Sequence, residues 1–436
     1  MPARHWKSAA LSVLLAIFLC AGAAGQEKER PKLKDFGSSL KRSQSDEKKK
    51  PAAKPGAKRT DQTSAPSSDD IDVLKVETSL VTSDVLVLDA RGNPVKGLTE
   101  KDFLITEDGR PQQVGVLTMG DNVKVPRTIV LIIDYSNSQF PFIGNSIAAA
   151  KSLVDKLPPS DRMAIVTDDV EMIQDFTRDK EKLKGKLNSL LDRISGINKG
   201  GGRQFGKSQQ YSALLATLNE AFINEDQRPI VIFQTDGDQL AYLRNSPLTS
   251  DLSAFSYDKK MAERLRKRFE ELRVDFSLDD ICRAAEKARA TIYTVVPGHQ
   301  LLGRPLAEQI ALTRVYYTES SLSFRSVTPE QRAQVEALLT DEKLKPAAEN
   351  QAKIQGALAA VANSTGGWTM FLEQPDDAER IYSGILDDIN HRYLVGYYPT
   401  NKEHDGKRRR LEISVRDHPE YNVVGRRWYF APAAGQ

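Results

Sequence analysis

Asp134, Ser136 and Ser138 are oxygen-bearing side chains at alternate positions, directly after the unbroken apolar run 129–133. A run of this kind is typical of a parallel strand that is buried on both faces. In open α/β sheets, ligands bind just beyond the carboxyl ends of the strands, which is where these side chains would lie. A carboxylate and two hydroxyls are hard oxygen donors, so the arrangement favours Mg²⁺, Mn²⁺ or Ca²⁺ over a soft metal. The alternative interpretation is an Asp/Ser turn that binds no metal.

A second carboxylate follows another apolar run. Residues 230–233 lead through Gln234 and Thr235 to Asp236. Because neighbouring strand ends lie side by side in a doubly wound sheet, we expect Asp236 to face Asp134 across one crevice. An octahedral ion would take the two serine hydroxyls directly, and the aspartates directly or through water. One coordination position would remain open for an acidic ligand.

The glycine-rich loop 200–206 carries a competing pattern. Residues 201–208 fit the phosphate-binding expression G-x-x-x-x-G-K-S, which ends in Lys207 and Ser208, and the later IVIFQTD resembles the strand and aspartate of a nucleotide hydrolase. A phosphate-binding loop should follow a strand, however, whereas the segment 183–194 before this loop has helical spacing. Nucleotide binding is therefore the alternative, and metal binding is the preferred hypothesis.

Hydrolase chemistry finds little support in the sequence. The histidines beyond the first 25 residues stand beside no nucleophile pattern and are not in H-E-x-x-H spacing; they are His299, His391, His404 and His418. No G-x-S-x-G elbow occurs either. The sequence therefore predicts a protein that is not an enzyme.

The segments around these motifs alternate between strands and helices. We expect strands at 127–133, 162–167, 229–234 and 291–296, and helices at 143–157, 183–194, 211–222 and 278–289. Such alternation predicts an α/β fold with a doubly wound, mostly parallel sheet covered by helices on both faces. Two highly charged segments, 240–276 and 299–350, are expected to be exposed helical insertions on this core, which as a whole spans 123–390.

Both ends of the ordered chain have the alternation of β-strands. The expected strands are 73–88, 103–106 and 114–117 before the core, and 393–398, 410–415 and 426–430 after it. We expect the two groups, within 71–122 and 391–432, to combine into one flanking β-sandwich.

The first 70 residues predict export. Residues 1–25 combine a basic start with an apolar stretch and small residues, which is typical of a cleaved signal peptide. Residues 26–70 are polar and rich in lysine, which predicts a disordered basic linker. After cleavage we expect no integral membrane span, no disulfide because Cys282 would be the single cysteine left, and a secreted or periplasmic protein. With 62 basic against 59 acidic residues, no nucleic-acid partner is indicated.

Several motifs together resemble a known family. They include GNPVKGLTEKDFLITEDGRPQQV, IVLIIDYSNS, PPSDRMAIVTDD, DFTRDKEKL, VIFQTDG, ATIYTVVPG, NSTGG and YLVGYYPTN. The chain resembles von Willebrand factor A (VWA) domain proteins with a metal-ion-dependent adhesion site, and more narrowly the secreted "VWFA-related" proteins of Acidobacteria. The resemblance implies a non-catalytic, adhesion-like module that binds a protein partner through the partner's Asp or Glu. Asp134, Ser136, Ser138 and Asp236 match the family's metal positions.

The fifth metal position departs from the family pattern. Ser208 stands where the family usually has a threonine shortly before a helix. Serine keeps the hydroxyl but lacks the methyl group that restrains the rotamer, and Lys207 adds positive charge beside a cation. We therefore expect a weakened site, and a metal-independent structural envelope protein is the third hypothesis.

Overall fold

The computed structural model describes residues 41–42, 80–119, 127–196, 204–222, 228–248, 263, 267, 270–322 and 328–432. The predicted signal peptide lies outside these residues. No helix among the described residues is both long enough and apolar enough to cross a membrane.

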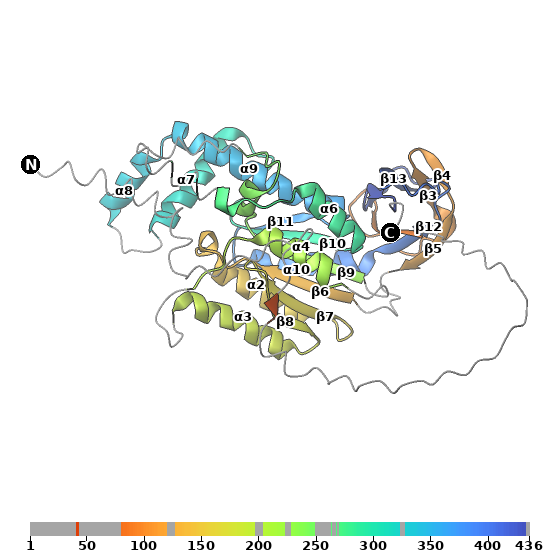
Figure 1. Cartoon of the computed structure of the whole chain (residues 1–436), viewed down its shortest axis with the longest axis horizontal. Coiled ribbons are helices and arrows are strands. Elements are labelled where there is room, and N and C mark those ends of the chain that lie inside the picture. Colours follow the sequence, from red (N-terminus) through yellow and green to blue (C-terminus); the bar gives the residue numbers. More distant parts are fainter. Residues whose placement is uncertain are drawn as a thin grey trace, which may run out of the picture.

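A central, mostly parallel sheet forms the middle layer (Figure 1). Its strands follow the order β1-β8-β7-β6-β9-β10-β11, and every neighbouring pair is parallel except β7 with β8. Their bounds are β1 Lys41–Arg42, β6 Arg127–Ile133, β7 Arg162–Thr167, β8 Glu171–Thr177, β9 Arg228–Gln234, β10 Thr291–Pro297 and β11 Thr369–Leu372. This sheet confirms the predicted doubly wound α/β class.

Strand β6 shows why the sheet needs helices on both faces. All seven of its residues are buried. Ile129, Leu131 and Ile133 belong to one hydrophobic cluster, with helices α2 (Ile143–Lys156), α3 (Lys180–Ser195) and α10 (Asp377–His391). Val130 and Ile132 belong to the opposite cluster, with α4 (Gln210–Glu220), α6 (Leu278–Lys287) and α9 (Asp341–Ser364). Alternate side chains of this one strand thus contribute to two hydrophobic cores, one on each face of the sheet.

Residues of the predicted insertion at 299–350 form a small cluster of their own. Helices α7 (Leu306–Leu322) and α8 (Pro329–Leu338) project away from the sheet in Figure 1. The small core consists of Ile310 of α7, Leu339 directly after α8, and Leu344 and Ala348 of α9. Helix α9 begins within the insertion but then packs on the sheet through Leu358 and Val361. The first turns of α9 are charged and lie within the predicted insertion, whereas its second half belongs to the main core.

The sandwich forms from both ends of the chain, as predicted. One sheet has the order β14-β2-β12-β5 and the other β15-β13-β3-β4. Their bounds are β2 Val81–Leu88, β3 Phe103–Glu107, β4 Arg110–Gln112, β5 Val114–Met119, β12 Tyr393–Tyr397, β13 Arg408–Val415, β14 Asn422–Val424 and β15 Trp428–Phe430. Residues of both sheets share one hydrophobic core, in which Val85 and Tyr393 are fully buried.

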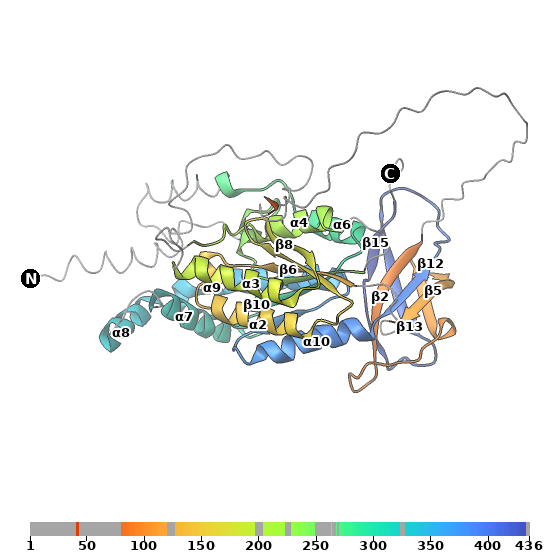
Figure 2. The same ribbon diagram turned by 90° about the horizontal axis from the view of Figure 1, so that it is seen from below.

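Helix α10 leads from the α/β core directly into the sandwich (Figure 2). Arg392, between α10 and β12, is 2% exposed and donates to both carboxylate oxygens of Asp388 at 2.8 Å. It also donates to the carbonyls of Gly366 at 2.6 Å and Asp84 at 3.2 Å. One guanidinium therefore joins α10, the loop before β11 and strand β2.

Several elements were not expected from the sequence. Strands β8, β11 and β14 are short or partly exposed and lack long apolar runs, and α10 was not separated from its surroundings. Residues Lys41–Arg42 fall within the predicted disordered linker, but they pair with Glu171 and Met172 at the edge of the sheet. The prediction was wrong for these two residues because an open strand edge offers backbone hydrogen bonds to any extended segment.

Candidate metal centre

The ends of β6 and β9 bring the predicted donors to one edge of the sheet. Ile133 pairs with Gln234, and Asp134 N–H extends the ladder by donating to the Gln234 carbonyl at 3.0 Å. The Thr235 hydroxyl donates to Asp134 Oδ2 at 2.8 Å. Asp134 and Asp236 therefore lie in one cluster, 2% and 9% exposed, as the strand-end argument predicted.

The loop after β6 turns both serine hydroxyls toward each other. Ser136 N–H donates to Asp134 Oδ1 at 2.9 Å, and the Oγ atoms of Ser136 and Ser138 lie 3.0 Å apart. Ser138 also hydrogen-bonds to the Asp236 carboxylate. Four of the five predicted donors are thus connected.

Ser208 adjoins this group without a direct bond to it. Its backbone has φ of 53°, and its N–H donates to Asp168 Oδ2 at 2.8 Å. Within the described residues, its hydroxyl makes no hydrogen bond with Asp134, Ser136, Ser138 or Asp236. Asp168, which follows β7, is what links Ser208 to the cluster.

Sequence reasoning missed two carboxylates of this cluster. Asp168 is fully buried, and Asp238 lies in the turn just after Asp236. The same signal that identified Asp134 was available for Asp168, because it follows the apolar strand β7 directly. No comparable signal marks Asp238.

Burial first, and repulsion between carboxylates second, raise the pKa values of three acids at this edge of the sheet. Burial, followed by the charge of Asp134, raises the pKa of Asp236 to about 7. Burial and the charges of Asp134 and Asp169 raise the pKa of Asp168 well above its usual range. Burial and the charges of Asp236 and Asp134 do the same for the pKa of Asp238. Each carboxylate therefore disfavours the ionised form of its neighbours.

Two neutral side-chain amides, those of Gln210 and Gln139, donate hydrogen bonds to this cluster. Gln210 Nε2, at the start of α4, donates to Asp134 Oδ2 at 2.9 Å and to Asp238 Oδ1 at 2.6 Å. Gln139 Nε2 donates to Asp236 Oδ2 at 2.6 Å. The Oε1 of Gln139 is buried and has no hydrogen-bond partner among the described residues.

No positive charge from the described part of the chain balances these carboxylates. The ion pairs of the described residues include none with Asp134, Asp168, Asp236 or Asp238. Among the same residues, no three Asp, Glu, His or Cys side chains are grouped so as to hold a metal by themselves. The predicted shell contains only two carboxylates and is completed by hydroxyls, so its donors still fit a hard divalent cation.

The described part of the glycine-rich loop does not fit phosphate binding. Helix α3, not a strand, precedes the loop, and residues 201–203 lie outside the described residues. The Ser208 N–H, which a bound phosphate would require, donates to the Asp168 carboxylate instead. A buried carboxylate at that place repels an anion.

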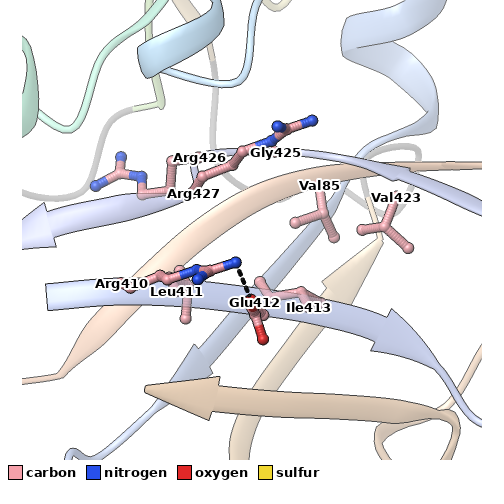
Figure 3. A pocket seen from close by; sticks show the side chains of 9 residues that line it. All are labelled: Val85, Arg410, Leu411, Glu412, Ile413, Val423, Gly425, Arg426 and Arg427. Carbon is pink, nitrogen blue, oxygen red and sulfur yellow. Dashed lines mark ion pairs between the residues drawn. The ribbon is translucent and has the colours of Figure 1, made fainter. Parts of the chain in front are cut away.

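A cavity of about 240 Å³ lies elsewhere, in the sandwich (Figure 3). Two of its arginines are already paired, Arg410 with Glu412 at 2.6 Å and Arg426 with Glu286 at 2.7 Å. The cavity is lined by Val85, Arg410, Leu411, Glu412, Ile413, Val423, Gly425, Arg426 and Arg427. It shares no residue with the carboxylate cluster.

Comparisons with known proteins give structural neighbours only. No family model matches the chain, and no curated protein matches it. The von Willebrand factor domain of the type V pili tip protein Mfa5 from Porphyromonas gingivalis is 16% identical, with a TM-score of 0.31, over 62% of this chain and 96% of that one. BatB from Bacteroides thetaiotaomicron is 14% identical, with a TM-score of 0.31, over 60% of this chain and 98% of that one.

A third structure, proximal thread matrix protein 1 from the mussel byssus, has a zinc-occupied metal-ion-dependent adhesion site. It is 12% identical, with a TM-score of 0.30, over 66% of this chain and 50% of that one. Nothing about the activity of the present chain follows from these similarities. Its own sheet order and helix layers define a doubly wound, mostly parallel α/β fold with a flanking β-sandwich.

Proposed function

We propose that this chain is an exported, non-catalytic protein-binding module that engages its partner through a divalent cation. Asp134, Ser136, Ser138, Ser208 and Asp236 would hold the ion, and Mg²⁺ is the preferred one. A position left open on the ion would accept an Asp or Glu side chain of the partner. The proposal includes membership of the secreted VWFA-related family, and a final location in the periplasm or outside the cell.

The observation that carries the proposal is the uncompensated negative charge around Asp134. Burying carboxylates is costly unless they are paired or coordinate a metal. Asp134, Asp168 and Asp236 are each at least 91% buried, and no lysine or arginine of the described residues forms an ion pair with them. A divalent cation would remove the repulsion and let all three carboxylates stay ionised at neutral pH.

The protein's own groups would orient the bound ion. Ser136 and Ser138 present hydroxyl oxygens 3.0 Å apart. The Ser136 backbone N–H and the Thr235 hydroxyl hold the two oxygens of Asp134, so that this carboxylate has one fixed orientation. When bound, the ion would supply the positive charge that attracts the acidic side chain of the partner.

Titration calorimetry of the protein without its first 25 residues tests the proposal. Mg²⁺ and Mn²⁺ are expected to bind at one site, and Asp134→Asn is expected to abolish the heat. ATP is expected to give no heat with or without Lys207→Ala. Lys207→Ala is expected to preserve or tighten metal binding, because it removes a positive charge beside the cation. Absence of Mg²⁺ and Mn²⁺ binding would refute the metal site, and ATP binding that Lys207→Ala removes would favour the nucleotide alternative.

One observation favours a metal-independent structural role as the second candidate. The Gln210 amide bridges Asp134 and Asp238, and it thereby satisfies both carboxylates without a cation. A partner recovered with this protein from cell-surface extracts would bind equally well in EDTA if this role is correct. Under the preferred proposal, EDTA releases the partner and Mg²⁺ restores binding.

A further inference from the structure

Asp168 holds two separate loops with one carboxylate. Its Oδ1 accepts a hydrogen bond of 3.1 Å from Tyr135 N–H, in the loop after β6. Its Oδ2 accepts one of 2.8 Å from Ser208 N–H, in the loop before α4. The carboxylate is fully buried, so water does not compete for either bond. Each oxygen thus fixes one of the two loops that carry the proposed metal donors.

Backbone hydrogen bonds also join the three segments that meet at Asp168, which are the loop after β6, the turn after β7 and the loop before α4. Gly206 N–H donates to the Tyr135 carbonyl at 3.2 Å, and Gln209 N–H donates to the Asp168 carbonyl at 3.0 Å. A Cβ atom on Gly206 would lie 2.0 Å from Asp168 Oδ1, so only glycine lets the loop approach this closely. The three segments therefore meet with no room to shift.

The junction also accounts for the backbone of Ser208. Its φ of 53° is in the left-handed region, which costs free energy for any residue other than glycine. Such a conformation persists only where surrounding bonds hold it. Two hydrogen bonds to Asp168 stabilise this conformation. Ser208 N–H donates to its Oδ2, and Gln209 N–H donates to its carbonyl.

We propose that Asp168 is a positioning residue that clamps Ser208 and the loop of Ser136 and Ser138 together, so that their hydroxyls can reach one cation. The inference rests on the proposed metal-dependent function and adds to it the residue that assembles the site. Asp168 acts through the two loops, since both of its oxygens are used by backbone donors.

Asp168→Asn is the direct test. An asparagine of the same shape accepts one backbone N–H, but its NH₂ group opposes the other, so one loop is released. Mg²⁺ affinity, measured by calorimetry, is expected to fall about 10- to 100-fold, as it does when residues that orient metal ligands are replaced. Asp169→Asn is the matched control, because it removes the same charge one position away, where the carboxylate accepts the hydroxyl of Tyr135 and not its backbone N–H.

Hydrogen exchange in EDTA gives a readout that does not depend on the metal. Asp168→Asn is expected to speed exchange in peptides containing Tyr135 and Ser208 while β6 and β9 stay protected, and Gly206→Ala is expected to do the same. Faster exchange throughout the sheet, or unchanged exchange in both loops, would overturn the clamp. So would wild-type Mg²⁺ affinity in Asp168→Asn or an equal loss of affinity in Asp169→Asn.

The two measurements separate the two ideas. If the unmodified protein binds no Mg²⁺, the proposed function fails, and the exchange data still decide whether Asp168 holds the loops. If it binds Mg²⁺ and Asp168→Asn binds equally well, the proposed function stands and the positioning role is refuted.

Discussion

The side-chain amide of Gln210 donates to Asp134 at 2.9 Å and to Asp238 at 2.6 Å, so one neutral group bridges two carboxylates. Gln210 is fully buried at the start of α4. A bound cation would stabilise the same two carboxylates more strongly, because it carries a full positive charge whereas the amide is neutral. The amide therefore stabilises the metal-free state and competes in part with the ion.

Replacing Gln210 with leucine is expected to destabilise the metal-free protein by about 1–3 kcal/mol, since it removes the donor of Asp238 Oδ1 and leaves Asp134 Oδ2 with the Thr235 hydroxyl. Saturating Mg²⁺ should recover most of that loss. Urea unfolding in EDTA and in Mg²⁺ measures both values. Gln355→Leu is the control, since Gln355 is buried beside the backbone of Leu301 and Leu302, and its loss should be the same in both conditions.

Removing either hydroxyl of the loop after β6 should weaken the metal site selectively. Ser136→Ala and Ser138→Ala are each expected to reduce Mg²⁺ affinity by about tenfold or more, because each deletes an oxygen donor. Ser146→Ala provides a control, since Ser146 in α2 is as buried as Ser136 and its Oγ has no hydrogen-bond partner among the described residues. Calorimetry showing equal affinity for all three variants would contradict the assignment.

The raised pKa of Asp236 predicts a pH dependence of the metal-free protein. The folded carboxyl keeps its proton up to about pH 7, whereas the ordinary value is 3.8, so the folded state binds more protons in that interval. Its contribution to the free energy of unfolding therefore falls as pH rises through this range. Asp236→Asn stays neutral, so in EDTA it should become more stable relative to the wild type between about pH 5 and about pH 8.

A constant stability difference between these two proteins across the pH range would contradict the prediction. Adding Mg²⁺ should oppose the trend, because the ion binds the ionised carboxylate and competes with the proton. Thermal unfolding at matched ionic strength measures both effects.

The buried pair of Arg392 and Asp388 should be costly to break. Arg392→Met leaves Asp388 buried without its partner, which is expected to cost about 3–5 kcal/mol of unfolding free energy. Arg380→Met removes the partner of Asp377 from an exposed pair of the same helix and should cost about 0–1 kcal/mol. Denaturant unfolding of both variants gives the comparison, and similar losses in the two would refute the argument.

Strong local patterns explain what the sequence predicted. The apolar runs that end in Asp134 and Asp236 identify two neighbouring strands, and their order in the sheet brings the two carboxylates together. Gln210 could not be identified, because it follows polar residues at the first position of a helix and its role depends on Asp238, which is distant in the sequence. Strand β8 was missed because its pattern is mixed and it pairs antiparallel in an otherwise parallel region.

Apart from the two-residue strand β1, the described α/β core is inserted in the chain between β5 and β12. These two strands are hydrogen-bonded neighbours, paired from Met119 with Tyr393 to Val114 with Tyr397. The points where the chain enters and leaves the core are therefore fastened together outside it. Mechanical tension applied between the start of β2 and the end of β15 would be carried by the hydrogen-bond ladders of the sandwich before it reached the core. Such a force would reach Asp134 only after the hydrogen bonds between β5 and β12 had broken.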